Sequence, residues 1–165
     1  MRNRRRGYIV NISSMGGRLV FPGAGAYHAS KYALEALSDA LRFELGGFGI
    51  HVVLIEPGLI RTAFGETAAS SVDGTRTATR DPYAYFHSEV ARITRESYHK
   101  GSLAPFASDP AAVADTVVRA VSSAHPKARY VVSPSAVLLL RLRRVLPDRW
   151  WDRFLARTYP RPGIG

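Results

Sequence analysis

The chain has 165 residues, 46% of them hydrophobic, which fits one globular domain with a core and excludes a disordered chain. It contains no cysteine, which excludes disulfides and thiolate metal sites and agrees with a reducing, cytoplasmic location. The formal net charge is +10, but the arginines gather near the two ends outside any recognisable nucleic-acid-binding motif, so we expect solvated helix faces and no nucleic-acid partner.

Two short runs rich in apolar and β-branched residues predict buried parallel strands, over 8–13 and 50–55. Between them a loop over 15–25 leads into a helix from Ala26 to about Leu45, which two glycines end. Its apolar residues recur at helical spacing: Tyr27, Leu34, Leu37, Leu41 and Leu45. We therefore predict a helix between two parallel strands.

The second half begins with a loop, which two helices follow. Residues 63–80 are rich in Ala, Ser, Thr and Gly without useful periodicity, which predicts a mobile loop. Asp81 and Asp109 are each followed by proline, a typical helix start, and the first helix extends to about Lys100. The second helix has an expected apolar face of Val113, Val117, Val118 and Val121.

The basic tail, residues 135–158, mixes leucines, aromatics and arginines at helical spacing. One interpretation is an amphipathic membrane-surface anchor with Trp150 and Trp151 at the interface. The other is that its apolar faces pack on the fold or line a substrate entrance, as in ordinary globular helices. We favour packing and keep peripheral membrane contact as the alternative. No stretch has the ~18 apolar residues that cross a bilayer, nor an apolar amino-terminal segment of signal-peptide length.

Ser14, Tyr27 and Lys31 have the most informative spacing in the chain. Tyr27 and Lys31 stand at i and i+4, so they lie on one helix face. A phenol titrates near pH ~10, and acid/base work near neutrality needs a pKa lower by about 3 units. A cation about 4 Å away in a partly buried site supplies energy of that order. A hydrogen bond from Ser14 would stabilise an oxygen on which charge develops, so the three predict a site acting on a carbonyl.

Three segments resemble the short-chain dehydrogenase/reductase family in order and spacing. They are Ile-Val-Asn-Ile-Ser-Ser at 9–14, Tyr-His-Ala-Ser-Lys at 27–31 and Pro-Gly-Leu-Ile-Arg-Thr at 57–62. The resemblance implies that Tyr27 is the general acid/base, that Ser14 positions the substrate carbonyl, and that Lys31 binds the nicotinamide ribose and lowers the pKa of Tyr27. It also implies NADP or NAD as cofactor, hydride transfer to or from a small carbonyl or alcohol substrate, and a homo-oligomeric parent enzyme.

The same resemblance assigns further residues to the site. Those expected to hold the nicotinamide and its carboxamide, beside Tyr27 and Lys31, are Pro57, Gly58, Ile60 and Thr62. Gly58 would allow close backbone approach. Those expected either to line an apolar substrate pocket with Ser14 or to belong to the core are Met15, Phe21 and Phe64. The five histidines show no ligand spacing, so we expect ordinary surface or partly buried side chains and no metal site.

The resemblance implies an α/β fold, a partial Rossmann-like doubly wound parallel sheet of three carboxyl-terminal strands with flanking helices, in one domain over 1–165. It assigns the last of these strands to residues 130–133, which precede Pro134. The amino-terminal cofactor-binding half, with its Gly-rich turn, has no counterpart, and a truncated start is the simplest account. Gly23-Ala-Gly25 does not replace that turn, because no strand immediately precedes it and His28 takes the place of its third glycine. The alternative function is therefore a catalytically inactive fragment that acts as an interaction or membrane-surface module.

Overall fold

The computed structural model describes residues 1–73 and 81–163, which form an α/β fold around a parallel sheet. The strands lie in the order β1-β2-β3 and span Gly7–Ile12, Ile50–Pro57 and Arg129–Val132. All three predicted strands are therefore confirmed, with ends that differ by one or two residues. The middle strand, β2, is almost wholly buried, as its run of apolar residues requires.

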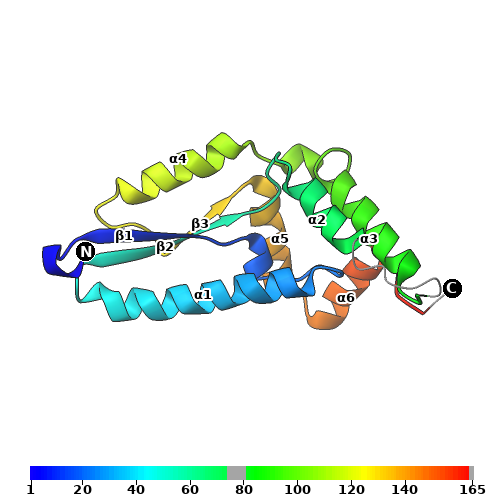
Figure 1. Ribbon diagram of the computed structural model, residues 1–165, viewed down its shortest axis with the longest axis horizontal. Coiled ribbons are helices and arrows are strands. Elements are labelled where there is room, and N and C mark those ends of the chain that lie inside the picture. Colours follow the sequence, from blue (N-terminus) through cyan, green and yellow to red (C-terminus); the bar gives the residue numbers. More distant parts are fainter. Residues whose placement is uncertain (74–80, 164–165) are drawn as a thin grey trace.

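Helices cover both faces of this sheet and its carboxyl edge (Figure 1). Helix α1 runs along one face and α4 along the other, while α2, α3, α5 and α6 lie beyond the carboxyl ends of the strands. The α-helices are α1 (Gly25–Gly46), α2 (Phe64–Asp73), α3 (Ala84–Ser97), α4 (Pro110–Val121), α5 (Pro134–Val145) and α6 (Asp148–Ala156). Short 3-10 turns are η1 (Arg2–Arg4), η2 (Met15–Gly17) and η3 (Ala104–Phe106).

The face that α1 turns toward the sheet is more polar than its apolar spacing predicted. Leu37 is 55% exposed, whereas Glu35 and Ser38 are buried. Asn11 of β1 donates a hydrogen bond from Nδ2 to Ser38 Oγ (2.8 Å), and Ser38 donates to the carbonyl oxygen of Leu34 (2.7 Å). These bonds satisfy the buried hydroxyl of Ser38, so the helix packs on the sheet without an unbroken apolar stripe.

The loop predicted over 63–80 is wrong for its first part, because residues Phe64–Asp73 form helix α2. The other residues of that prediction, 74–80, lie outside the described part. Small side chains allow α2 to pack closely against α3, and Ala69 is fully buried there. Thr67 and Ser71 donate hydrogen bonds to carbonyl oxygens four residues earlier. Their hydroxyls therefore form hydrogen bonds within the helix, and they do not end it.

The structure also corrects the predicted bounds of α3 and the predicted buried face of α4. Helix α3 begins at Ala84 because Asp81 accepts a hydrogen bond from the backbone N–H of Tyr83 (2.9 Å) in a preceding turn, and it ends at Ser97. On α4, Val113 and Val117 pack against β2 and β3, but Val118 is 61% exposed. The helix is rotated so that Thr116 and Ala120 are its buried residues.

The tail forms two helices separated by Leu146 and Pro147, and its apolar faces pack into the larger core cluster. That cluster contains Met15, Leu19, Leu59, Ala107, Ala136, Leu139 and Trp151. Trp151 is 4% exposed, whereas Trp150 is 57% exposed. The favoured interpretation, that the tail packs on the fold, therefore accounts for its buried apolar residues. Among the described residues no helix is both long and apolar enough to span a bilayer.

Candidate active site

The end of β1 places Ser14 at the carboxyl edge of the sheet. The backbone N–H of Ser13 still donates to the carbonyl oxygen of Ile55 (2.8 Å), and Ser14 then caps the turn η2. Its Oγ accepts a hydrogen bond from the N–H of Gly16 (3.0 Å) and lies 3.4 Å from the carbonyl oxygen of Pro57, to which it donates. That second contact is long for an O–H···O bond, so the hydroxyl hydrogen is available to another acceptor.

The first turns of α1 bring Tyr27 and Lys31 to the same edge. The Nζ of Lys31 donates a hydrogen bond to the carbonyl oxygen of Ile12 (3.0 Å) and lies 5.8 Å from the centre of the Tyr27 ring. The Tyr27 ring lies against Gly16, where a Cβ would be only 3.2 Å from Tyr27 Cε1. The structure therefore brings together Ser14, Tyr27 and Lys31, as their spacing predicted.

Aromatic side chains surround Tyr27. Its ring centre lies 5.6 Å from that of Phe64, at the start of α2, and 5.5 Å from that of His28. Burial raises the pKa of Tyr98 to about 12, and the neighbouring phenols of Tyr27 and Tyr159 add to the rise. Tyr98 therefore keeps its proton near neutrality.

His28 is a structural part of the site that the sequence analysis missed. It is 4% exposed, although an ordinary surface or partly buried position was expected. Its Nε2 accepts the backbone N–H of Phe21 (3.1 Å), so Nδ1 carries the hydrogen and donates it to the carbonyl oxygen of Gly16 (2.8 Å). Burial lowers the pKa of His28, against the opposing effect of the bond to Gly16. The neutral ring thus fastens the serine turn to α1.

The residues that follow β2 differ in their burial and in the groups that they leave for a ligand. Gly58 donates to the carbonyl oxygen of Val132 (3.0 Å), and a Cβ there would lie 2.5 Å from Ser133 Oγ, so contact with the start of α5 already requires a glycine. The side chain of Ile60 is buried in the core beside β2, which leaves only its backbone for a ligand. Thr62 is exposed, and its Oγ1 accepts the N–H of Phe64 (3.2 Å).

The three candidate pocket residues occupy different places. Met15 belongs to the larger core cluster, and Phe21 packs against that cluster with its ring centre 6.4 Å from that of Trp151. Phe64 is 45% exposed and lies beside Tyr27. Of the three, Phe64 is therefore the one in contact with the ring of the acid/base candidate. Within the described residues no group of three His, Asp or Glu side chains could hold a metal ion.

Comparisons with known proteins agree with this geometry. Residues 1–73 match the family model described as short chain dehydrogenase, a range that includes Ser14, Tyr27, Lys31 and 57–62. The chain is 42% identical over 149 residues to an uncharacterized oxidoreductase, YbbO, of Escherichia coli K12, covering 90% of this chain and 48% of that protein. It is 34% identical over 148 residues to the NADPH-dependent 3-dehydrocapnine reductase of Ornithobacterium rhinotracheale, covering 90% of this chain and 49% of the relative.

Among solved structures, a short-chain dehydrogenase from Streptomyces avermitilis has 30% identity and a TM-score of 0.64, over 95% of this chain and 54% of that one. The chain thus spans about half the length of the curated relatives it matches. Its strand order, its serine, tyrosine and lysine at one sheet edge, and these matches agree with one another. The chain belongs to the short-chain dehydrogenase/reductase family.

Proposed function

We propose that this chain supplies the acid/base centre of an NAD(P)-dependent oxidoreductase, which transfers a hydride between nicotinamide and a carbonyl or alcohol carbon. Tyr27 is the proposed general acid/base, Ser14 the hydrogen-bond donor to the substrate oxygen, and Lys31 the group that favours the phenolate. One observation carries the proposal: Lys31 Nζ is held at the end of β1, 5.8 Å from the centre of the Tyr27 ring.

The polar groups of the site suit a nicotinamide riboside. The ammonium of Lys31 has three N–H donors and gives one to Ile12, which leaves two for ribose hydroxyls. The hydroxyl of Thr62 accepts from Phe64 and keeps its own hydrogen for a carboxamide oxygen. These donors fit the proposed roles of Lys31 and Thr62. The relative from Ornithobacterium is itself described as NADPH-dependent, which supports NADPH as the first cofactor to test.

The proposed steps use the groups of this chain in order. The cofactor, when bound, supplies or accepts the hydride. Ser14 turns its hydroxyl from the long contact with Pro57 to the substrate oxygen and stabilises the charge that develops there. Tyr27 gives its proton to that oxygen as the carbonyl is reduced, and takes it back in the oxidation direction. Lys31, with a charge close to the phenol ring, favours the ionised state between those transfers.

The test combines cofactor binding with turnover. NADPH and NADH are titrated by fluorescence, and ketones from cyclohexanone to a steroid ketone are then supplied with the cofactor that binds. Tyr27→Phe should abolish turnover while the cofactor Kd changes by less than about twofold. Tyr32→Phe is the matched control, because Tyr32 is exposed on the same helix. Turnover retained in Tyr27→Phe would remove Tyr27 from the mechanism.

A second candidate function is association through α1, without catalysis. Phe43 is 91% exposed and Leu37 55% exposed on that helix, and covering these apolar side chains would favour association. Light scattering after gel filtration tests this candidate. A dimer that Phe43→Ser dissociates would support association, whereas a concentration-independent monomer would exclude it. Saturable NADPH binding separates the two functions, since association alone does not require it.

A further inference from the structure

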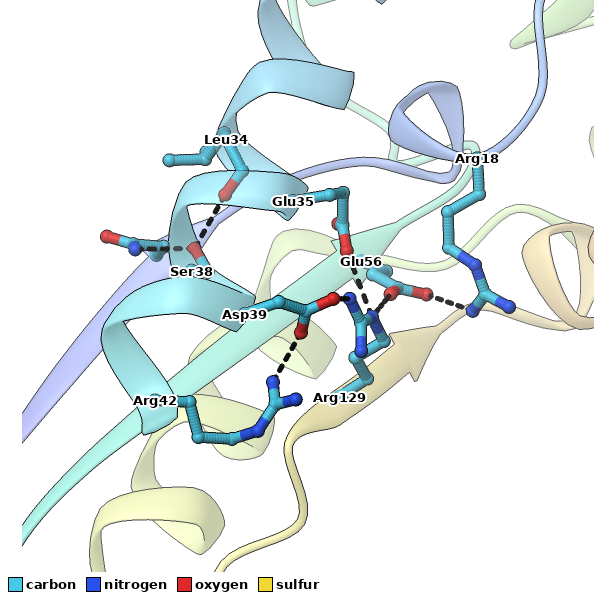
Figure 2. Close-up of polar contacts among 9 residues, drawn as sticks. Arg18, Leu34, Glu35, Ser38, Asp39, Arg42, Glu56 and Arg129 are labelled. Carbon is cyan, nitrogen blue, oxygen red and sulfur yellow. Dashed lines mark hydrogen bonds and ion pairs between the residues drawn. The ribbon is translucent and has the colours of Figure 1, made fainter. Parts of the chain in front are cut away.

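A group of charged side chains lies behind the proposed acid/base site, between α1 and the sheet (Figure 2). We call it the Arg129 cluster, and it consists of Arg18, Glu35, Asp39, Arg42, Glu56 and Arg129. Arg129 enters from β3 and donates from Nε to Glu35 (3.0 Å) and from Nη2 to Asp39 (2.7 Å) on α1. Three carboxylates and three guanidiniums therefore join α1, β2, β3 and the segment after η2.

Glu56 is the most buried member of the cluster, with a side chain that is 0% exposed. Its Oε1 lies 3.1 Å from Arg129 Nε, but that N–H is directed to Glu35, and Oε1 has no hydrogen-bond partner among the described residues. Its Oε2 accepts from Arg18 (3.1 Å). A buried carboxylate is costly without a hydrogen bond, so Glu56 depends on Arg18. Burial and the carboxylate of Glu35 raise the pKa of Glu56, and Arg18 opposes that rise.

Arg18 belongs to the segment that carries Ser14. It directly follows η2, and its backbone N–H donates to the carbonyl oxygen of Met15 (3.0 Å). The turn is pressed against α1, because a Cβ at Gly17 would lie 2.9 Å from Glu35 Cγ and 3.1 Å from the carbonyl oxygen of Lys31. The ion pair between Arg18 and Glu56 therefore holds the segment after η2, and η2 itself packs against the turn of α1 that contains Lys31.

Glu56 also stands directly before Pro57, the residue whose carbonyl oxygen faces Ser14 Oγ at 3.4 Å. The Arg18–Glu56 pair thus closes a small ring through the chain: from Ser14 along η2 to Arg18, across to Glu56, and by one peptide bond to Pro57. Opening that ring would remove one of the links between the serine turn and the end of β2, while the other contacts of Arg129 would still tie β3 to α1.

We propose that Glu56 is a positioning residue of the site, whose carboxylate holds Arg18 and so keeps the Ser14 hydroxyl in place beside the end of β2. Glu56 acts through Arg18 and the turn, and it touches none of the reacting atoms. The consequence for catalysis rests on the proposed function. The positioning itself can be measured without any turnover.

The first readout is amide hydrogen exchange of the full chain by NMR. Gly16 donates its N–H to Ser14 Oγ, so the protection of this amide reports the geometry of the turn. Glu56→Gln and Arg18→Met should each speed exchange at Gly16 by about tenfold, and the double variant should add nothing further. Arg18→Lys, which keeps the charge, should restore part of the protection. Arg42→Gln is the matched control, because Arg42 pairs with Asp39 away from the turn.

The second readout is the split between kcat and KM wherever the wild type turns over. Glu56→Gln should lower kcat and leave the KM for cofactor nearly unchanged. The proposal would be overturned if the rate of amide hydrogen exchange at Gly16 stayed within about twofold of the wild-type rate in both Glu56→Gln and Arg18→Met. Equal acceleration at Val53 in β2 would also overturn it, because that pattern indicates general loosening. If the wild type shows no turnover, the proposed function fails, and the exchange result still decides the role of Glu56.

Discussion

The Nζ of Lys31 donates a hydrogen bond to the carbonyl oxygen of Ile12, the last residue of β1. This single bond fastens the start of α1 to the end of the strand that leads to Ser14. The same ammonium lies over the Tyr27 ring, so its position serves both the fold and the electrostatics of the phenol. A charge held by the backbone in this way stays close to the ring without rearrangement.

Replacing Lys31 should therefore affect chemistry more than folding. Lys31→Met removes the charge and should lower kcat/KM at pH 7 by about 10²-fold or more. Lys31→Arg should retain part of the activity. Lys127→Met, on an exposed lysine that precedes β3, is the matched control. A kcat/KM of Lys31→Met within about threefold of the wild-type value would contradict the proposed electrostatic role.

His28 should make the stability of the chain depend on pH below neutrality. Burial holds the pKa of His28 below its ordinary value of 6.5, so the unfolded chain binds this proton more readily than the folded chain. The contribution is fully present above pH 6.5 and is lost as pH falls toward the folded pKa. We expect the Tm to drop between pH 7.5 and 5.5, and to drop less in His28→Gln. Calorimetry of both proteins checks this, and equal slopes would contradict it.

Tyr98 and Tyr159 should make the fold sensitive to alkali. Burial raises the pKa of each phenol to about 12, from an ordinary value of 10.0, so the folded chain keeps these protons longer than the unfolded chain. Their contribution is full below pH 10 and is lost between pH 10 and 12, up to about 2 to 3 kcal/mol for each group.

Urea unfolding at pH 9 and pH 11 measures the loss from these two phenols. Tyr98→Phe should reduce the difference between the two pH values, because one of the titrating groups is removed. An unchanged difference would show that the Tyr98 phenol is accessible in the folded chain.

The two adjacent tryptophans of α6 should differ sharply in their effect on stability. Trp151 is 4% exposed and belongs to the larger core cluster, so Trp151→Ala should lower the free energy of unfolding by about 3 to 5 kcal/mol. Trp150 is 57% exposed, and Trp150→Ala should cost less than about 1 kcal/mol. Chemical denaturation of both variants provides the comparison. Similar losses would mean that α6 is not packed as the structure shows.

Local signals in the chain were sufficient for the strands and for the acid/base helix. Runs of apolar and β-branched residues are short, continuous and bounded, so β1 and β2 could be located to within one or two residues, whereas β3 was located by the family resemblance. The spacing of Tyr27 and Lys31 depends only on helical geometry. Helix α2 was missed because its Ala, Ser and Thr residues carry no periodic apolar signal, and its burial comes from packing against α3.

The amino-acid sequence by itself determined where the first two strands and helix α1 form, and that Tyr27 and Lys31 share one face of that helix, because these features follow from near neighbours along the chain. Only the tertiary structure decided which face of α1 is buried and which side chain pairs with Glu56. The buried charge of Glu35 is bonded to Arg129, 94 residues later in the chain, and Glu56 to Arg18, 38 residues earlier. Such partners are chosen by the packing of distant segments, and no local spacing reveals them.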